Sequence, residues 1–138
     1  HEPRHQVKTA AEIMTAQPFC LAPDALVAHA WQLMQQKGFR HVLITLPDLT
    51  LVGIISDRDL WHAGPMDGLG HTPVSELMKT QVVCAGSQTS IRRLAEIMLL
   101  HHFDALPVTD DMQRTEGIVT RTDLLRALVL DAPLELWV

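Results

Sequence analysis

The sequence contains no tyrosine, three phenylalanines and three tryptophans, so aromatic side chains cannot supply most of a core. It also lacks any apolar run long enough to span a membrane. Hydrophobic residues nevertheless make up 47% of the 138 residues, which is ordinary for a globular protein. We therefore expect a folded chain that does not insert into a membrane, with a core of Leu, Ile, Val, Met and Ala.

Basic residues are in the minority, with 11 Lys and Arg against 16 Asp and Glu and a net charge of −5. Binding to DNA or RNA needs basic surface that neutralises phosphates, so a nucleic-acid partner is not expected. A small anionic ligand needs only a local positive site, and the composition leaves that possibility open.

Cysteine is also scarce, because Cys20 and Cys84 are the only two, too few for a disulfide framework. Residues 1–5 are polar and lack the apolar core of a signal peptide. Both features predict a reducing, cytoplasmic setting. The two cysteines are interpreted as small buried hydrophobic residues. The alternative, a redox pair, requires the fold to bring them within bonding distance.

The sequence repeats itself at an offset of 64 residues. Residues 11–60 align without a gap with 75–124, and 11 of 50 positions are identical, where ordinary composition gives roughly three. The identical pairs are Glu12/Glu76, Met14/Met78, Gln17/Gln81, Cys20/Cys84, Met34/Met98, Phe39/Phe103, Thr45/Thr109, Gly53/Gly117, Ile54/Ile118, Asp59/Asp123 and Leu60/Leu124. The chain is therefore an internal duplication.

The sequence pattern of each copy predicts a strand, a helix, two strands and a closing helix, in that order. Apolar residues at helical spacing run from Val27 to Met34 and from Ile91 to Met98. Strands are expected at 19–21, 42–44 and 51–55, and at 82–84, 106–108 and 117–119. Asp24 and Ser87 are expected as helix N-caps and Gly38 as a C-cap. His102 replaces that glycine in the second copy, so its helix is expected to end differently.

The expected fold class is α+β, with two tandem β-α-β-β-α motifs at 7–64 and 74–130. Residues 65–73, rich in Pro and Gly, form a linker, and 131–138 form a C-terminal tail. A unit of about 60 residues has little core of its own. We therefore expect the two copies to pack together about a pseudo-two-fold axis.

The junction between the last strand and the last helix has the same motif in both copies, at 53–59 and 117–123. The pattern is Gly, two apolar residues, Ser or Thr, two variable residues and Asp. Glycine leaves room for a flat ligand or a backbone, the hydroxyl and the helix N-terminus suit a phosphate, and the carboxylate suits a ribose diol. The same spacing is also that of a helix capping box, so the motif alone leaves a cap and a ligand site open.

The duplicated unit with this motif resembles a pair of cystathionine-β-synthase (CBS) domains, a Bateman module. Residues 38–42 and 53–60 are similar to the bacterial family pattern, and the resemblance covers nearly all of 7–130. It implies that AMP, ADP, ATP or S-adenosylmethionine binds, without chemical change, in clefts between the copies. No cofactor is implied.

The resemblance also implies roles for particular residues. Asp59 and Asp123 would bind ribose hydroxyls, Ser56 and Thr120 would face phosphate, and the apolar residues near 42, 44, 106 and 108 would flank adenine. Site one, the site that contains Asp59, would be preferred by a phosphorylated ligand because it also contains Arg40, His41 and Arg58. In its adenine wall, Leu43 would replace a proline of the family pattern. The complete set of expected ligand-binding residues is Pro18, Arg40, His41, Val42, Ser56, Asp57, Arg58, Asp59, Val82, Leu106, Pro107, Thr120, Arg121 and Asp123.

Two functions remain open for this sequence. The first is an energy-sensing regulatory module that forms a homodimer and acts on an attached or separate effector protein. The second is a structural dimerisation module with vestigial sites. This hypothesis would explain why Leu43 and Thr122 depart from the family pattern. No nucleophile–base pattern or P-loop is present, so catalysis is not expected, and the eight histidines do not show zinc-ligand spacing.

Overall fold

The computed structural model describes residues 8–131 and contains two three-stranded sheets. One sheet has the strand order β2-β3-β4 and the other β1-β6-β5. The elements are α1 (Ala10–Ile13), β1 (Thr15–Ala16), β2 (Cys20–Leu21), α2 (Val27–Lys37), β3 (His41–Thr45), β4 (Leu51–Ser56), α3 (Asp57–Ala63), α4 (Met66–Leu69), the 3₁₀ helix η1 (Val74–Glu76), α5 (Ile91–His101), β5 (Ala105–Thr109), β6 (Thr115–Thr120) and α6 (Arg121–Asp131). The α+β class expected from the sequence is confirmed.

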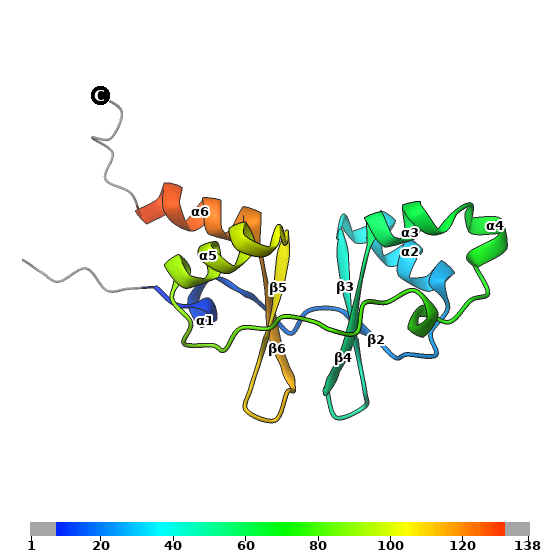
Figure 1. Cartoon of the computed structure of the whole chain (residues 1–138), viewed down its shortest axis with the longest axis horizontal. Helices are drawn as coiled ribbons and strands as arrows, with labels where there is room; N and C mark the ends of the chain where they lie inside the picture. The colour runs from blue at the N-terminus through cyan, green and yellow to red at the C-terminus, as the bar shows by residue number, and fades with distance from the viewer. Residues whose placement is uncertain (1–7, 132–138) are drawn as a thin grey trace, which may run out of the picture.

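The two halves stand side by side, with the hairpins β3–β4 and β5–β6 facing each other at the centre (Figure 1). A small apolar cluster that includes Leu43, Ala105 and Ile118 joins the two sheets. The hairpin turns are tied by two backbone bonds, from Leu51 N to Gln113 O at 2.9 Å and from Thr115 N to Leu49 O at 2.8 Å. These bonds exchange places under the 64-residue offset, as a pseudo-two-fold axis requires.

The first helix of each sequence copy packs into the core of the other copy. Ala10 is fully buried among α5, β5 and β6 of the second copy, and Val74 is fully buried among α2, β3 and β4 of the first. In Figure 1 helix α1 accordingly lies with α5 and α6. Burying these apolar residues in the opposite half makes the two halves interdependent, because neither core is complete without the other copy.

The segments that each copy contributes to the core of the other, which we call the exchanged segments, also cap the long helices α2 and α5. Leu26 precedes α2 and makes no side-chain cap bond, but Val27 N donates to Thr72 O at 2.8 Å. In the second half Ile91 N donates to Lys8 O at 3.1 Å. The linker between the copies therefore packs against the fold, and its carbonyl satisfies a helix-terminal donor.

Three sequence-based expectations about local structure are wrong. The N-cap positions are Leu26 and Ser90, not Asp24 and Ser87, because α2 begins two residues and α5 three residues later than those caps would place them. Helix α5 ends on His102 in the left-handed conformation, with φ +59°, which is the same device that Gly38 provides for α2.

The third correction is that residues 82–84 are not a strand. Directly after this segment, an isolated bridge joins Ala85 to Val108. In the first half, β2 pairs with β3 through Cys20 and Leu43. Pro107 takes the place of Leu43 in the second half and has no N–H to donate, which shortens the ladder.

Within residues 8–131 no helix is both long enough and apolar enough to cross a membrane. The expected C-terminal tail, apart from the end of α6, lies outside the described residues, as do His1 and His5.

Candidate functional site

Two pockets lie between the sequence copies. Pocket one, of about 550 Å³, is lined by Trp31, Gln35, Arg40, His41, Ile54, Ser56, Asp57, Arg58, Asp59, Trp61, Lys79, Gln81, Val82, Val83, His102, Phe103, Asp104, Ala105 and Pro107. Pocket two, of about 660 Å³, is lined by Thr15, Gln17, Pro18, Phe19, Gly38, Phe39, Arg40, His41, Leu43, Asp104, Ile118, Thr120, Arg121 and Thr122. Both volumes suit a small-molecule ligand.

The two pockets are related by the sequence repeat. Each takes its strand-to-helix junction from one copy, Ser56 in pocket one and Thr120 in pocket two. The opposite wall comes from the other copy, with Gln81 and Phe103 in pocket one and Gln17 and Phe39 in pocket two. Neither pocket can therefore form from one copy alone.

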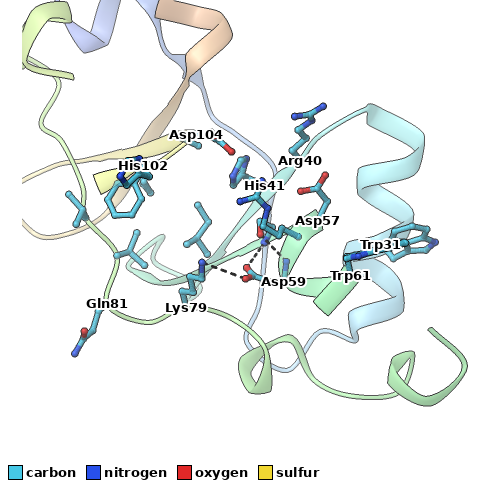
Figure 2. Close-up of a pocket in the computed structure, with 18 of the residues that line it drawn as sticks. Trp31, Arg40, His41, Asp57, Asp59, Trp61, Lys79, Gln81, His102 and Asp104 are labelled. Atoms are coloured by element: carbon cyan, nitrogen blue, oxygen red, sulfur yellow. Dashed lines mark hydrogen bonds and ion pairs between the residues drawn. The ribbon is translucent and has the colours of Figure 1, made fainter. Parts of the chain in front are cut away.

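The carboxylate of the junction motif caps its helix in both copies. Asp59 Oδ2 accepts from Ser56 N at 2.8 Å, and Asp59 N donates to Ser56 Oγ at 3.1 Å. The second oxygen, Oδ1, lies 3.6 Å from Lys79 Nζ (Figure 2). Asp59 is thus a helix cap that also lines pocket one, with its second carboxylate oxygen paired to Lys79.

Asp123 is held more completely. Its Oδ2 accepts from Thr120 N at 2.8 Å and from Thr120 Oγ1 at 3.1 Å, and Oδ1 lies 3.5 Å from Arg126 Nη1. Asp123 does not line pocket two. The two motif carboxylates, equivalent in sequence, therefore differ in their access to a ligand.

The motif glycines make room for protein, not for a ligand. A Cβ on Gly53 would overlap the Met78 side chain and lie 3.0 Å from Lys79 O. One on Gly117 would lie 2.8 Å from Thr15 O. The segment that approaches each glycine is the one exchanged from the other copy, which explains why both copies have glycine here.

Several residues expected at adenine lie elsewhere. Val42 and Leu106 are fully buried in the two cores and line neither pocket, because strand alternation points their side chains toward the helices. Pro107 borders pocket one and Leu43 borders pocket two, but both side chains are fully buried. Leu43 therefore belongs to the opposite site from the one expected.

Arg40, His41 and Asp104 line both pockets, and we call them the central trio. Arg40 and Asp104 are equivalent under the 64-residue offset, so opposite charges occupy the two sides of the pseudo-two-fold axis. Figure 2 shows all three side chains in the space between the halves. The sequence assigned Arg40 and His41 to site one alone, whereas the fold shares them between the two sites.

The charge of the lining does not favour an anion in pocket one. Its three cationic side chains are matched by three carboxylates: Arg40, Arg58 and Lys79 against Asp57, Asp59 and Asp104. Pocket two has Arg40 and Arg121 against Asp104 alone. The expected preference for site one counted Asp104 against the second site only and did not count Asp57 and Asp59 against the first; the lining of the two pockets reverses the balance.

The sequence interpretation missed residues that come from the opposite copy or from another helix. In pocket one these include Trp31, Trp61, Lys79, Gln81 and Phe103. The identical pairs of the repeat could have indicated some of these residues. Gln17/Gln81 and Phe39/Phe103 each place one member in each pocket. The tryptophans and Lys79 have no identical counterpart and carried no such signal.

Burial and the nearby carboxylates shift the pKa of His41 in opposite directions. Burial is the largest influence and lowers the pKa of His41 below 6.5; Asp104, Asp57 and Asp59 raise it, and Arg40 lowers it. Between the lowered pKa and 6.5 the unfolded chain binds a proton that the folded chain does not, so the free energy of unfolding falls as pH falls through this window.

We expect His41→Gln to flatten the dependence of stability on pH below about 6.5, the ordinary pKa of histidine. Urea unfolding at a series of pH values measures this. His62→Gln removes an exposed imidazole from α3 and is the control, expected to keep the native profile. An unchanged slope in His41→Gln would show that His41 is not the group responsible.

The described residues contain no group of three or more His, Cys, Asp or Glu arranged to hold a metal ion. Cys20 and Cys84 are free and partly buried. Burial raises the pKa of both thiols, and each Sγ donates to a nearby carbonyl, of Pro18 at 3.3 Å and Val82 at 3.6 Å.

The sequence pattern of the CBS domain matches residues 10–60 and 74–130. Among solved structures, CBSX2 of Arabidopsis thaliana in complex with AMP is similar, with a TM-score of 0.81 and 25% identity over 89% of this chain and 97% of that one.

Two curated relatives are enzymes of which this chain spans about a quarter. Inosine-5'-monophosphate dehydrogenase of Streptococcus pyogenes is 30% identical over 126 residues, covering 89% of this chain and 25% of the enzyme. Homoserine O-acetyltransferase of Methanosphaerula palustris is 27% identical over 117 residues, covering 85% and 23%. The two family matches and the CBS-pair fold together show that this chain belongs to the CBS domain family and forms a tandem pair, a Bateman module.

Proposed function

We propose that this chain is a regulatory module that binds adenine nucleotides of the AMP, ADP and ATP class between its two CBS motifs, without catalysis. The observation that carries this proposal is the pair of repeat-related pockets, each requiring both copies. A ligand in such a pocket contacts both halves at once. It would favour one relative arrangement of the halves, which an attached or separate effector can detect. The AMP complex of CBSX2 supports this ligand class.

In pocket one we assign the ribose to Asp59 and the base to the apolar wall. Asp59 Oδ1 makes no cap bond and lies 3.6 Å from Lys79 Nζ, so a ribose hydroxyl would bind this oxygen beside Lys79 or in its place. Val82 and Val83 line the same pocket, are partly exposed and offer apolar surface to adenine. Ser56 and Arg58 lie on the motif side of the pocket.

The phosphate is assigned to the end of each pocket that contains the central trio. Arg40 lines both pockets, and Arg121 adds a second cation to pocket two. A guanidinium binds phosphate oxygens with directional hydrogen bonds. Because pocket two has the more positive lining, we expect it to take the first phosphorylated ligand.

A second candidate function, a structural dimerisation module, is favoured by an exposed apolar face on the second half. Leu125, Leu128 and Val129 of α6 are 60–71% exposed, and they share one side of the helix by their spacing. Leu99 and Leu100 of the neighbouring α5 are both 72% exposed. Exposed apolar side chains gathered on adjacent helices are typical of interfaces, so a homodimer fits either function.

Thermal unfolding with AMP, ADP, ATP and S-adenosylmethionine tests the proposed function. A ligand at 100 times its dissociation constant stabilises the folded state by about 2.7 kcal/mol, roughly 5–10 °C for a chain of this length. We expect AMP to raise the midpoint by this amount. Asp59→Asn, which retains a cap acceptor, should lose the part of the shift due to pocket one.

Arg92→Glu is the matched control, because this exposed side chain lies on α5 and lines neither pocket. It should keep the full shift. No shift with any adenosine compound, together with a dimer that Leu128→Glu converts to monomer, would leave the structural module as the function.

A further inference from the structure

The two pockets share part of their lining, although their other walls are separate. Arg40, His41 and Asp104 line both. A phosphate at the shared end of one pocket therefore lies close to the groups that a phosphate in the other pocket would use. This arrangement bears on how the two sites influence each other, and it rests on the proposed function.

The shared end contains one arginine and one carboxylate, not two arginines. Asp104 stands where the repeat places the equivalent of Arg40. One guanidinium can face one phosphate directly, and a second phosphate must bind against the negative charge of the first. Strict symmetry in the repeat would have placed a second arginine here.

Asp104 also restrains the extra cation of pocket two. Arg121 Nε lies 3.2 Å from Asp104 Oδ1 and 3.4 Å from Phe103 O, the backbone acceptor to which it donates. A phosphate that binds Arg121 competes with Asp104 for it. The Asp104 carboxylate then loses its cation while it still lines pocket one, and it opposes an anion there.

We propose that an anionic ligand in one pocket lowers the affinity of the other pocket for a second anionic ligand, through the shared residues Arg40, His41 and Asp104. A ligand without phosphate does not compete for these groups. The two sites are therefore coupled for AMP and independent for adenosine. Such coupling spreads the response over a wider range of nucleotide concentration than two equal, independent sites give.

Tryptophan fluorescence can observe pocket one separately. Trp31 and Trp61 line pocket one, and no tryptophan lines pocket two within the part of the chain that the structure describes. The sequence has three tryptophans, so a Trp137→Phe background leaves only these two. Calorimetry on the same protein gives the total binding.

Each pocket can be closed to a phosphate by a carboxylate on an exposed side chain. Thr122 lines only pocket two, and Arg58 lines only pocket one. Because coupling is reciprocal, the pocket that fills second in the native chain must tighten when the other is closed. We expect pocket one to bind AMP about 5-fold more tightly, or more, in Thr122→Glu. The added charge by itself would weaken AMP binding, so a direct effect has the opposite sign.

Gln36→Glu adds the same charge on α2 outside both pockets and should leave AMP binding as in the native chain. Adenosine should bind pocket one equally in the native chain and in Thr122→Glu. If neither Thr122→Glu nor Arg58→Glu tightens the remaining pocket for AMP, or if adenosine shows the same change as AMP, the coupling is refuted while the binding function stands. Absence of AMP binding in the native chain would refute both.

Discussion

Leu106→Ala should lower the free energy of unfolding by about 2–5 kcal/mol, the usual cost of removing a buried leucine side chain. Leu106 is fully buried in the core of the second half, with Leu94, Val108 and Val119. Leu106 itself lines neither pocket. We therefore expect AMP affinity, measured at a temperature where the variant is folded, to change little.

Urea unfolding measures the stability loss, and calorimetry with AMP measures the affinity. Leu46→Ala is the control, because Leu46 lies in the turn after β3 and is 40% exposed. It should cost less than about 1 kcal/mol. A variant Leu106→Ala that is nearly as stable as the native chain but loses AMP affinity more than tenfold would restore the sequence-based assignment of Leu106 to the adenine wall.

Gly117→Ala should destabilise the protein by about 3 kcal/mol, at the upper end of the cost of overpacking. A Cβ at this position would lie 2.8 Å from Thr15 O and 2.9 Å from Met14 Cγ. The Met14 side chain can move, but Thr15 belongs to β1, whose backbone pairs with β6. The substitution therefore forces the exchanged strand away from its partner.

Gly68→Ala provides the matched control, because no heavy atom lies within 4 Å of a Cβ at Gly68. This glycine lies in α4, where alanine is the better helix former, so the expected change is neutral or slightly stabilising. Denaturant unfolding of both variants gives the comparison. If Gly117→Ala unfolds like Gly68→Ala, the close approach of β1 does not limit the residue at 117.

Both predictions concern residues for which the sequence motif and the resemblance suggested a ligand role. Within a single motif, a glycine that admits a ligand and one that admits a neighbouring strand look the same, because both requirements are steric. Likewise an apolar residue in a strand can face a helix or a pocket, and the direction depends on register. Val42 and Leu43 are adjacent in β3, yet Val42 is buried in the core of the first half and Leu43 in the cluster between the two sheets, next to pocket two.

The sequence by itself determined the duplication, the α+β class, the closing helices at Asp57 and Arg121, and the resemblance to a CBS pair. These conclusions depend on local periodicity and on identities at a fixed offset, and both are properties of the chain before it folds. The family match over residues 10–60 and 74–130 and the two-sheet structure confirm the CBS pair and its fold class.

Only the tertiary structure decided which copy completes which half. Ala10 and Val74 occupy equivalent places in opposite cores, and either core would bury the same kinds of apolar residue. The local sequence pattern therefore does not predict that the first helix of each copy packs into the other half. That exchange depends on the chain connections and on close packing against Gly53 and Gly117. The exchange brings residues from both copies into each pocket, and the meeting of the copies at their axis makes Arg40, His41 and Asp104 common to the two sites.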